Sequence, residues 1–423
     1  MKPKLLTTLP TYTGRLFAAD VVAGITVAMV AIPLSIAIGI ASGADPAKGL
    51  ITAIIGGFLV SMLGGSRVQI GGPTGAFIVV VYGVIAQHGY DGLVLATLMA
   101  GAILLLAGLL RVGNLIAFVP EAVVNGFTIG IAVIIASGQL KDFFGLGASH
   151  APAEFLGKME ALWAARATIN WAATAAGLAT LALLVALRRL FPRVPGPIFV
   201  LGAVSLAVWA LHQGVDTIFS RYGELPNHLP VPMLPKVSLA RLTELLPSAF
   251  VIAFLAAIES LLSAMVADRM VEGAQHRPNA EVLAQGWANI GSALFGGLPA
   301  TGAIARTATN VRAGGRTPVA GMVHAATILI VMMAVAPLAG YLAMPALAAL
   351  LLITAWNMSE PHKWRSYWRA PIEDRVLLLL TLVLTVLTDL TVAIGVGVGV
   401  GLGLALRLRD NRIKAPDWHT PER

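Results

Sequence analysis

One interrupted apolar stretch decides the fold and the chemistry of this chain: ANIGSALFGGLPATGAIARTATNVRAGGRTPVA, from Ala288 to Ala320. Gly296, Gly297 and Pro299 break its apolar run, and Arg306 stands where hydrocarbon is expected. A charged side chain at the centre of a bilayer costs at least ~2.5–3.5 kcal/mol, so Arg306 should face a partner or water. We therefore expect the functional site of the chain to lie here.

The composition places the chain in a lipid bilayer. Its 423 residues are 57% hydrophobic and only 12% charged, whereas a soluble protein carries roughly 25% charged residues. Cysteine is absent, which excludes disulfide scaffolds and thiolate metal sites. The net charge is +8, but the basic residues are scattered between apolar spans and therefore indicate topology instead of nucleic-acid binding. We expect an integral membrane protein of a bacterial inner membrane.

The apolar segments predict fourteen membrane spans. A helical span needs about 20 predominantly apolar residues. By this measure the spans lie near 18–40, 47–64, 74–87, 91–110, 118–138, 168–188, 196–212, 246–266, 280–296, 303–312, 317–336, 340–356, 372–388 and 390–407. The third and the tenth are too short to cross a bilayer alone, and both adjoin breaks rich in Gly and Pro.

The basic residues orient these spans. Of the 29 lysines and arginines, 21 fall on the N-terminal side of the predicted membrane, 7 fall on the opposite side, and Arg306 lies within a span. The excess of positive charge on the cytoplasmic side of membrane proteins then predicts that both termini are cytoplasmic. The two longer connections, 139–167 and 213–245, are expected to be external loops.

The two halves of the chain share a pattern. SRVQIGGPTGAFIVV (66–80) precedes the third span, and LFGGLPATGAIAR (294–306) stands at the corresponding place of the second half. Seven spans in each half start on opposite sides, so the halves are inverted. We expect an all-α membrane protein with two inverted seven-span repeats, about 15–213 and 240–407, in which spans 3 and 10 are half-helices. Paired interrupted segments of this kind indicate the central site of a transporter.

The two interrupted segments predict an anion site. If each is an extended run that leads into a half-helix, the unpaired N–H groups of two helix starts meet near the midplane and attract an anion. The alternative is that the glycines only allow close helix packing. The predicted substrate-binding residues in these segments are Gly72, Thr74, Gly75, Thr301, Gly302, Ala303, Ile304, Ala305 and Arg306.

Further candidates lie in the first and eighth spans. Glu259 is the acid most clearly embedded in an apolar segment, and Ser263, four residues on, shares its helix face. Together they are expected to bind a coupling H⁺ or Na⁺; the alternative is a structural ion pair of Glu259 with Arg306. Pro33 should bend the first span and bring Ser35 and Ile38 to the cavity, unless it is an ordinary kink.

These motifs resemble the SulP family of anion transporters, which includes the animal solute-carrier anion exchangers. The resemblance covers nearly the whole chain and includes DVVAGITVAMVAIPLSIA (20–37), GGSRVQIGGPTGAF (64–77), VPEAVVNGFTIGIAV (119–133) and residues 267–321. It implies a core domain (about 18–111 and 246–336) that moves against a gate domain (about 118–212 and 340–407) like an elevator, with substrate between the third and tenth helices.

Carried over by position, the family's site falls on Leu34, Ser35, Ile38, Thr74, Glu259, Ser263, Ala305 and Arg306. Relatives often have polar or aromatic residues where this chain has Leu34, Ile38 and Ala305, so the identity of the anion stays open. Family members usually continue into a cytoplasmic STAS domain. This chain ends at Arg423, soon after the last predicted span, so we expect residues 1–423 to form one transmembrane unit without that domain.

The expected function is secondary active transport of a small anion of the bicarbonate, sulfate or dicarboxylate class, coupled to H⁺ or Na⁺ through Glu259. One alternative is an anion channel or uncoupled exchanger that uses the same pocket. Another is a nucleobase carrier, but those usually carry acids in both the eighth and tenth spans, and here the tenth has Arg306 and no acid. An enzyme is not expected, and neither is a cofactor. The expected partners are a small inorganic or carboxylate anion, the bilayer and a second copy of the chain, but no nucleic acid.

Overall fold

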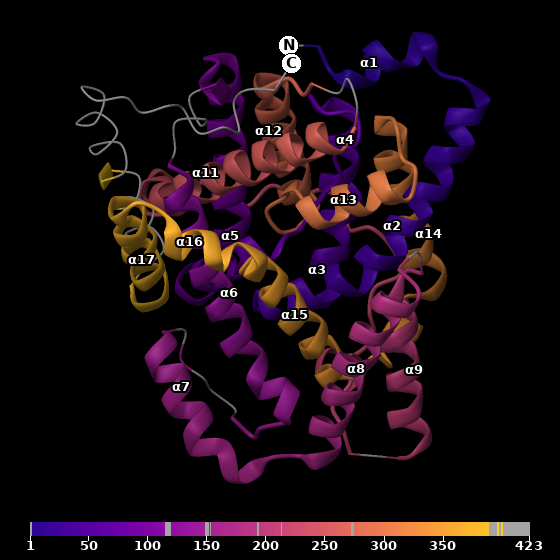
Figure 1. The fold of residues 1–423 in the computed structure, drawn as a ribbon, viewed down its shortest axis with the longest axis vertical. Helices are drawn as coiled ribbons and strands as arrows, with labels where there is room; N and C mark the ends of the chain where they lie inside the picture. The colour runs from indigo at the N-terminus through magenta and orange to yellow at the C-terminus, as the bar shows by residue number, and fades with distance from the viewer. Residues whose placement is uncertain are drawn as a thin grey trace.

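A computed structural model describes residues 2–114, 120–148, 152, 154–192, 194–212, 214–271, 275–388, 396 and 399–400. This part of the chain is helical apart from two strands of two residues each and the connecting segments (Figure 1). Seven helical segments are long and apolar enough to cross a membrane: Gly14–Ala41, Pro46–Leu63, Gly75–Leu109, Glu121–Phe144, Trp171–Leu190, Leu239–Met270 and Pro318–Ala339. The predicted count of fourteen spans stays a prediction, and the last of them, 390–407, falls largely outside the described residues.

The first half of the chain contains most of the long helices. Its elements are α1 (Lys4–Thr8), α2 (Gly14–Ala41), α3 (Pro46–Ile51), a π-helical segment (Thr52–Gly56), α4 (Gly57–Leu63), β1 (Gly71–Gly72), α5 (Ile78–Leu109), α6 (Glu121–Phe144), α7 (Phe155–Ala164), α8 (Trp171–Leu190) and α9 (Gly196–Ala210). A single 3-10 turn, Gly75–Phe77, leads into α5. The connection predicted as an external loop over 139–167 therefore contains the short helix α7.

The second half also contains both long and short helices. It consists of α10 (Ile218–Tyr222), α11 (Leu239–Met270), α12 (Pro278–Leu294), β2 (Thr301–Gly302), α13 (Ile304–Arg312), α14 (Pro318–Ala339), α15 (Met344–Met358), α16 (Trp364–Arg369) and α17 (Ile372–Leu387). The nine residues of α13 fall on the short tenth span of the sequence analysis.

Gly89 and Pro33 have different effects on the long helices that contain them. Gly89 has φ 70° and ψ 179°, a conformation that favours glycine, and it breaks α5 between the predicted spans 74–87 and 91–110. Pro33 was expected to bend the first span, and α2 continues through it from Gly14 to Ala41. Proline removes only one hydrogen bond of this helix, and packing of α2 against α14 and α3 keeps the rest in place.

The helices pack in two sets. α5 lies against α11 and α12, and α2 lies against α14, whereas α6 lies against α15 and α17, and α8 packs on α15. In Figure 1, α11, α12 and α13 lie toward the upper end of the view, and α7, α8 and α9 lie toward the lower end. The division into core and gate domains and the inverted repeat remain predictions.

The interrupted stretches of the two halves meet in the protein interior. β1 and β2 pair antiparallel, with Gly71 opposite Gly302 and Gly72 opposite Thr301. The Ala303 N–H donates to the Ile70 carbonyl at 2.8 Å and extends this pairing. Two segments about 230 positions apart in sequence are thus joined directly, because their extended backbones satisfy each other's hydrogen bonds inside an apolar environment.

A buried polar cluster holds these stretches in place. The Glu281 carboxylate is fully buried, and it accepts hydrogen bonds from the backbone N–H groups of Gly65 (2.8 Å) and Ser66 (3.2 Å). It also accepts from Ser260 Oγ (2.9 Å) and Gln285 Nε2 (3.2 Å). An apolar sequence context does not report burial: Glu281, on the more polar helix α12, is fully buried, whereas Glu259 in its apolar segment is half-buried.

Candidate functional site

Two helix starts face one cavity, and neither is capped by a side chain. β1 leads through Pro73 and Thr74 into the turn before α5, and β2 leads through Ala303 into α13. Thr74 and Ala303 occupy the N-cap positions, and neither side chain accepts a hydrogen bond from its helix. The first N–H groups of a helix lack partners within that helix, so both starts can offer donors to a ligand.

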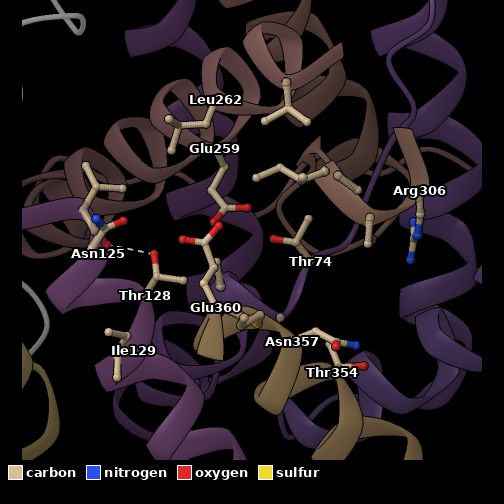
Figure 2. Close-up of a pocket in the computed structure, with 18 of the residues that line it drawn as sticks. Thr74, Asn125, Thr128, Ile129, Glu259, Leu262, Arg306, Thr354, Asn357 and Glu360 are labelled. Carbon is tan, nitrogen blue, oxygen red and sulfur yellow. Dashed lines mark hydrogen bonds between the residues drawn. The ribbon is translucent and has the colours of Figure 1, made fainter. Parts of the chain in front are cut away.

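The cavity at these starts, here called the central cavity, has a volume of about 530 Å³. Both helix starts line it, together with α2, α6, α11, α15 and the segment that follows α15. Figure 2 shows Thr74, Thr128 and Glu259 pointing into this space. The Thr74 hydroxyl is buried and makes no hydrogen bond within the described residues, which leaves it free for a ligand. A space of this size is typical of small-molecule sites.

Arg306 also lines the central cavity, and its side chain points away from Glu259 (Figure 2). The side chain is only 2% exposed, and its Nη2 donates to Ser35 Oγ at 3.1 Å. Its Nη1 has no hydrogen-bond partner within the described residues and lies against Gly72, where a Cβ atom would meet it. No ion pair joins Arg306 to Glu259 in this part of the chain, so the alternative of a structural pair between them is wrong for this structure.

Gly72 has a local reason to be glycine. Its φ of 149° lies in the region that favours glycine, and the guanidinium of Arg306 fills the space beside its Cα. Because Gly72 has no side chain, the Arg306 guanidinium can lie directly behind the β1–β2 pair.

Glu259 and Ser263 do not share an environment. Glu259 lines the central cavity from α11, and within the described residues its carboxylate has no cation within 4.0 Å. Ser263 is fully buried, does not line the cavity, and hydrogen-bonds to Thr307 Oγ1 of α13 at 3.1 Å. The spacing of four residues puts both on one broad face of α11, but α13 covers the part that holds Ser263.

Some of the remaining predicted residues line the cavity, and the others belong to the structure that surrounds it. Leu34, Ile38, Thr74, Gly75, Ala303, Ile304 and Ala305 line the cavity. Ser35 instead faces Arg306, and Gly72, Thr301 and Gly302 belong to the strand pair behind the helix starts. The Thr301 hydroxyl donates to the Ala256 carbonyl at 2.8 Å, which anchors this pair on α11.

The structure also adds polar residues that the sequence analysis missed. Glu121, Asn125 and Thr128 of α6 line the cavity, and their spacing of four and three residues on an apolar helix was a signal that could have found them. The segment after α15 contributes Glu360 and Lys363, which form an ion pair at 2.9 Å.

Tyr367 closes this edge of the cavity. Its hydroxyl donates to Glu360 at 3.1 Å. Burial and the neighbouring Glu360 carboxylate raise the pKa of Tyr367, so the phenol stays protonated and keeps this bond. The signal for Glu360 and Tyr367 in sequence was weak, because the segment looks like an ordinary interfacial connection.

Comparisons with known proteins agree on one family. Residues 17–381 match the model of the sulfate permease family. A putative sulfate transporter of Bacillus subtilis, YvdB, is 43% identical over 380 residues, which cover 90% of this chain and 72% of that protein. The bicarbonate transporter BicA of Picosynechococcus is 32% identical over 391 residues, covering 89% of this chain and 68% of the relative.

A solved structure shows the same fold. The transmembrane domain of a cyanobacterial bicarbonate transporter BicA superposes with a TM-score of 0.82 at 30% identity, and the match covers 91% of this chain and 99% of that domain. The helical arrangement around the β1–β2 pair is therefore a known membrane fold.

Proposed function

The chain belongs to the sulfate permease family of membrane anion transporters, and from this premise we propose that it is a secondary active transporter of a small anion. The substrate is of the sulfate, bicarbonate or dicarboxylate class and binds in the central cavity at the starts of α5 and α13. The observation that carries the proposal is the pair of uncapped helix starts, brought together by β1 and β2.

The electrostatics of the cavity favour an anion. Each helix start stabilises a nearby negative charge by about 0.3–1 kcal/mol at an exposed site and by more in a partly buried one. Arg306 adds a full positive charge behind both starts, in a buried place where the field is weakly screened. The Thr74 hydroxyl and the backbone N–H groups supply directed donors, so Arg306 acts through its field more than as a direct ligand.

The position of the cavity supports alternating access. Its lining comes from α2, the α5 start, α11 and α13 on one side and from α6 and α15 on the other. These are the two sets of helices that pack within themselves. An elevator movement of the first set against the second carries the site across the membrane without taking the helix starts apart.

Glu259 is the proposed coupling residue. Its carboxylate lines the same cavity as the helix starts, and the described residues provide it with no cation. A proton or Na⁺ can serve as that partner and offset the cost of keeping the charge in the membrane. The position of Ser263 does not support its share in this role, since it bonds to Thr307.

The proposed arrangement in the membrane is a homodimer with both termini in the cytoplasm. The distribution of lysines and arginines supports the orientation. In intact cells, a tag at either end should resist protease that is added outside the cells. After permeabilisation, the same tag should be cleaved. Chemical cross-linking of the purified chain in lipid nanodiscs should give a dimer.

The deciding experiment is uptake into proteoliposomes. The purified chain is reconstituted, and labelled sulfate, bicarbonate and a dicarboxylate are offered under imposed pH and Na⁺ gradients, with protein-free liposomes as the control. Accumulation of at least one anion that follows one gradient supports coupled transport. Equilibration without accumulation favours the uncoupled exchanger or the channel, and no uptake under any gradient overturns the proposal.

A further inference from the structure

A second cavity, here called the distal cavity, lies at the far end of the same helices. Its volume is about 760 Å³. The central cavity takes its lining from the first half of α6 and the second half of α11, whereas the distal cavity takes it from Ile134–Asp142 of α6 and from Ser248 and Val251 of α11. Residues between Ile78 and Gln87 of α5 line the distal cavity, whereas Pro73–Ala76, at the start that leads into α5, line the central one. The distal cavity thus faces the side of the protein opposite to the central one.

Three cations line the distal cavity, and two of them are unpaired. Arg221 is held by Asp142 at 2.7 Å and by Asp216 at 2.8 Å, so its charge is compensated. Lys141 and Lys158 have no carboxylate within 4.0 Å among the described residues. Two lysines from separate helices, α6 and α7, thus line one cavity without an ion pair in the described residues.

The surroundings of Lys158 indicate that an anionic partner is missing. Its Nζ lies 5.3 Å from the centre of the Tyr82 ring, a cation–π contact between α7 and the α5 half-helix. Burial lowers the pKa of Lys158, and no neighbouring acid offsets this. A bound anion would supply that compensation.

The other polar groups of the cavity fit a small oxyanion. Gln139, only 7% exposed, and Gln87 line it and can donate amide hydrogens. Glu154 also lines it, four residues before Lys158, but forms no ion pair with that lysine in the described residues. Lys141, Lys158 and Glu154 are thus the charged lining residues that form no ion pair in the described residues, and the two aspartates on Arg221 carry one negative charge more than that arginine. Lys141 lies in the last turn of α6, where a positive charge interacts favourably with the helix dipole. This interaction does not explain the presence of Lys158 at the same cavity.

We propose that the distal cavity is a second anion-binding site, in which Lys141 and Lys158 hold a small inorganic oxyanion. The role of this second site rests on the proposed function. The site captures the anion at the face opposite to the central cavity, before or after the anion binds at the helix starts. Lysines that form no ion pair raise the local concentration of an anion and its association rate.

The absence of cysteine from the chain allows a direct test. A Cβ at Gly138, which lines the distal cavity, meets no atom within 4 Å, so G138C introduces a single thiol there. The full chain in lipid nanodiscs is treated with an anionic and with a cationic methanethiosulfonate of similar size. The ratio of the two reaction rates reports the local potential, because both reagents react with the same thiolate.

The expected ratio favours the anionic reagent and falls by at least about threefold in G138C with K141Q and K158Q. E154Q should raise the ratio, and K236Q, an exposed lysine outside both cavities, should leave it unchanged. Sulfate or bicarbonate should slow the anionic reagent in G138C and not in the double-lysine variant.

A ratio that does not respond to K141Q and K158Q, or labelling that neither anion slows, overturns the proposal. Thermal unfolding of each variant in the same nanodiscs shows that the fold is retained. The labelling needs no transport, so it reads the distal cavity independently. Uptake by the unmodified chain with no response of the ratio would refute the second site alone, and a charge-dependent ratio without any uptake would refute only the proposed function.

Discussion

The Arg306 guanidinium donates from Nη2 to the Ser35 hydroxyl at 3.1 Å, and this bond ties the start of α13 to the middle of α2. It is the one hydrogen bond that the described residues give to the guanidinium head. The bond fixes the cation behind the β1–β2 pair, on the side away from Glu259 (Figure 2). The charge therefore acts on the helix starts without blocking the cavity that they face.

Substitution of Arg306 should weaken anion transport strongly. R306Q removes the buried charge and, because Gln is shorter than Arg, the hydrogen bond from Nη2 to Ser35. We therefore expect the transport rate at low anion concentration to fall by about tenfold or more, equivalent to about 1.4 kcal/mol. Initial uptake into proteoliposomes over a range of anion concentrations measures this. R312Q, at the C-terminal end of α13 and not at the cavity, is the matched control. Equal rates in R306Q and R312Q would contradict the field role.

We expect Ser35 to affect anion transport only through its hydrogen bond with Arg306. S35A removes the acceptor and leaves a buried charged donor unpaired, at a cost of about 1–3 kcal/mol. We expect lower thermal stability and reduced uptake in S35A, but little further loss when S35A is added to R306Q. Fully additive losses in the double variant would show that the two side chains act separately.

Gly72 is expected to tolerate no side chain. In G72A the new Cβ meets Arg306 Nη1, and the φ of 149° strains any residue other than glycine. We expect loss of uptake together with a lower unfolding temperature. G202A in α9, where a Cβ meets no atom within 4 Å, should be neutral or slightly stabilising. A fully active G72A would contradict the tight placement of Arg306 against the strand pair.

The sequence predicted the helical membrane fold and the meeting of the two interrupted stretches for a clear reason. Gly and Pro at matching places of two apolar halves can only be accommodated where backbone groups find partners, and the β1–β2 pair is that solution. The apolar spans around them are fixed by composition alone. The same reasoning put Thr74 and Ala305 at the cavity, where they lie.

What could not be predicted depends on side-chain direction and on contacts between distant helices. Ser263 and Glu259 are four residues apart, yet α13 covers one of them and not the other. Arg306 was expected to bind substrate or to pair with Glu259, but its guanidinium turns toward Ser35, in the space that Gly72 leaves behind the strand pair. Such choices depend on which neighbour lacks a Cβ, and periodicity does not reveal this.

Glu281 should be needed for folding more than for transport. Each carboxylate oxygen accepts two hydrogen bonds, so in E281Q the amide nitrogen faces donors whichever way the side chain turns. We expect a loss of roughly 2–4 kcal/mol of stability, since buried groups lose their partners. Thermal unfolding in detergent measures the change, and E160Q on the exposed face of α7 is the control. An unfolding temperature equal to that of E160Q would contradict the role of this cluster.

Glu259 should govern coupling and leave anion binding in place. Gln keeps the size of the side chain but cannot take up a proton or balance Na⁺, so E259Q should lose accumulation driven by a pH or Na⁺ gradient. The helix starts and Arg306 are unchanged in this variant, so equilibrium binding of the anion should stay within a few-fold of the parent chain. E121Q removes another acid of the same cavity and is the matched control. Gradient-driven uptake that survives in E259Q and fails in E121Q would move the coupling role from α11 to α6, because only one of the two carboxylates can then be the site at which the ion binds.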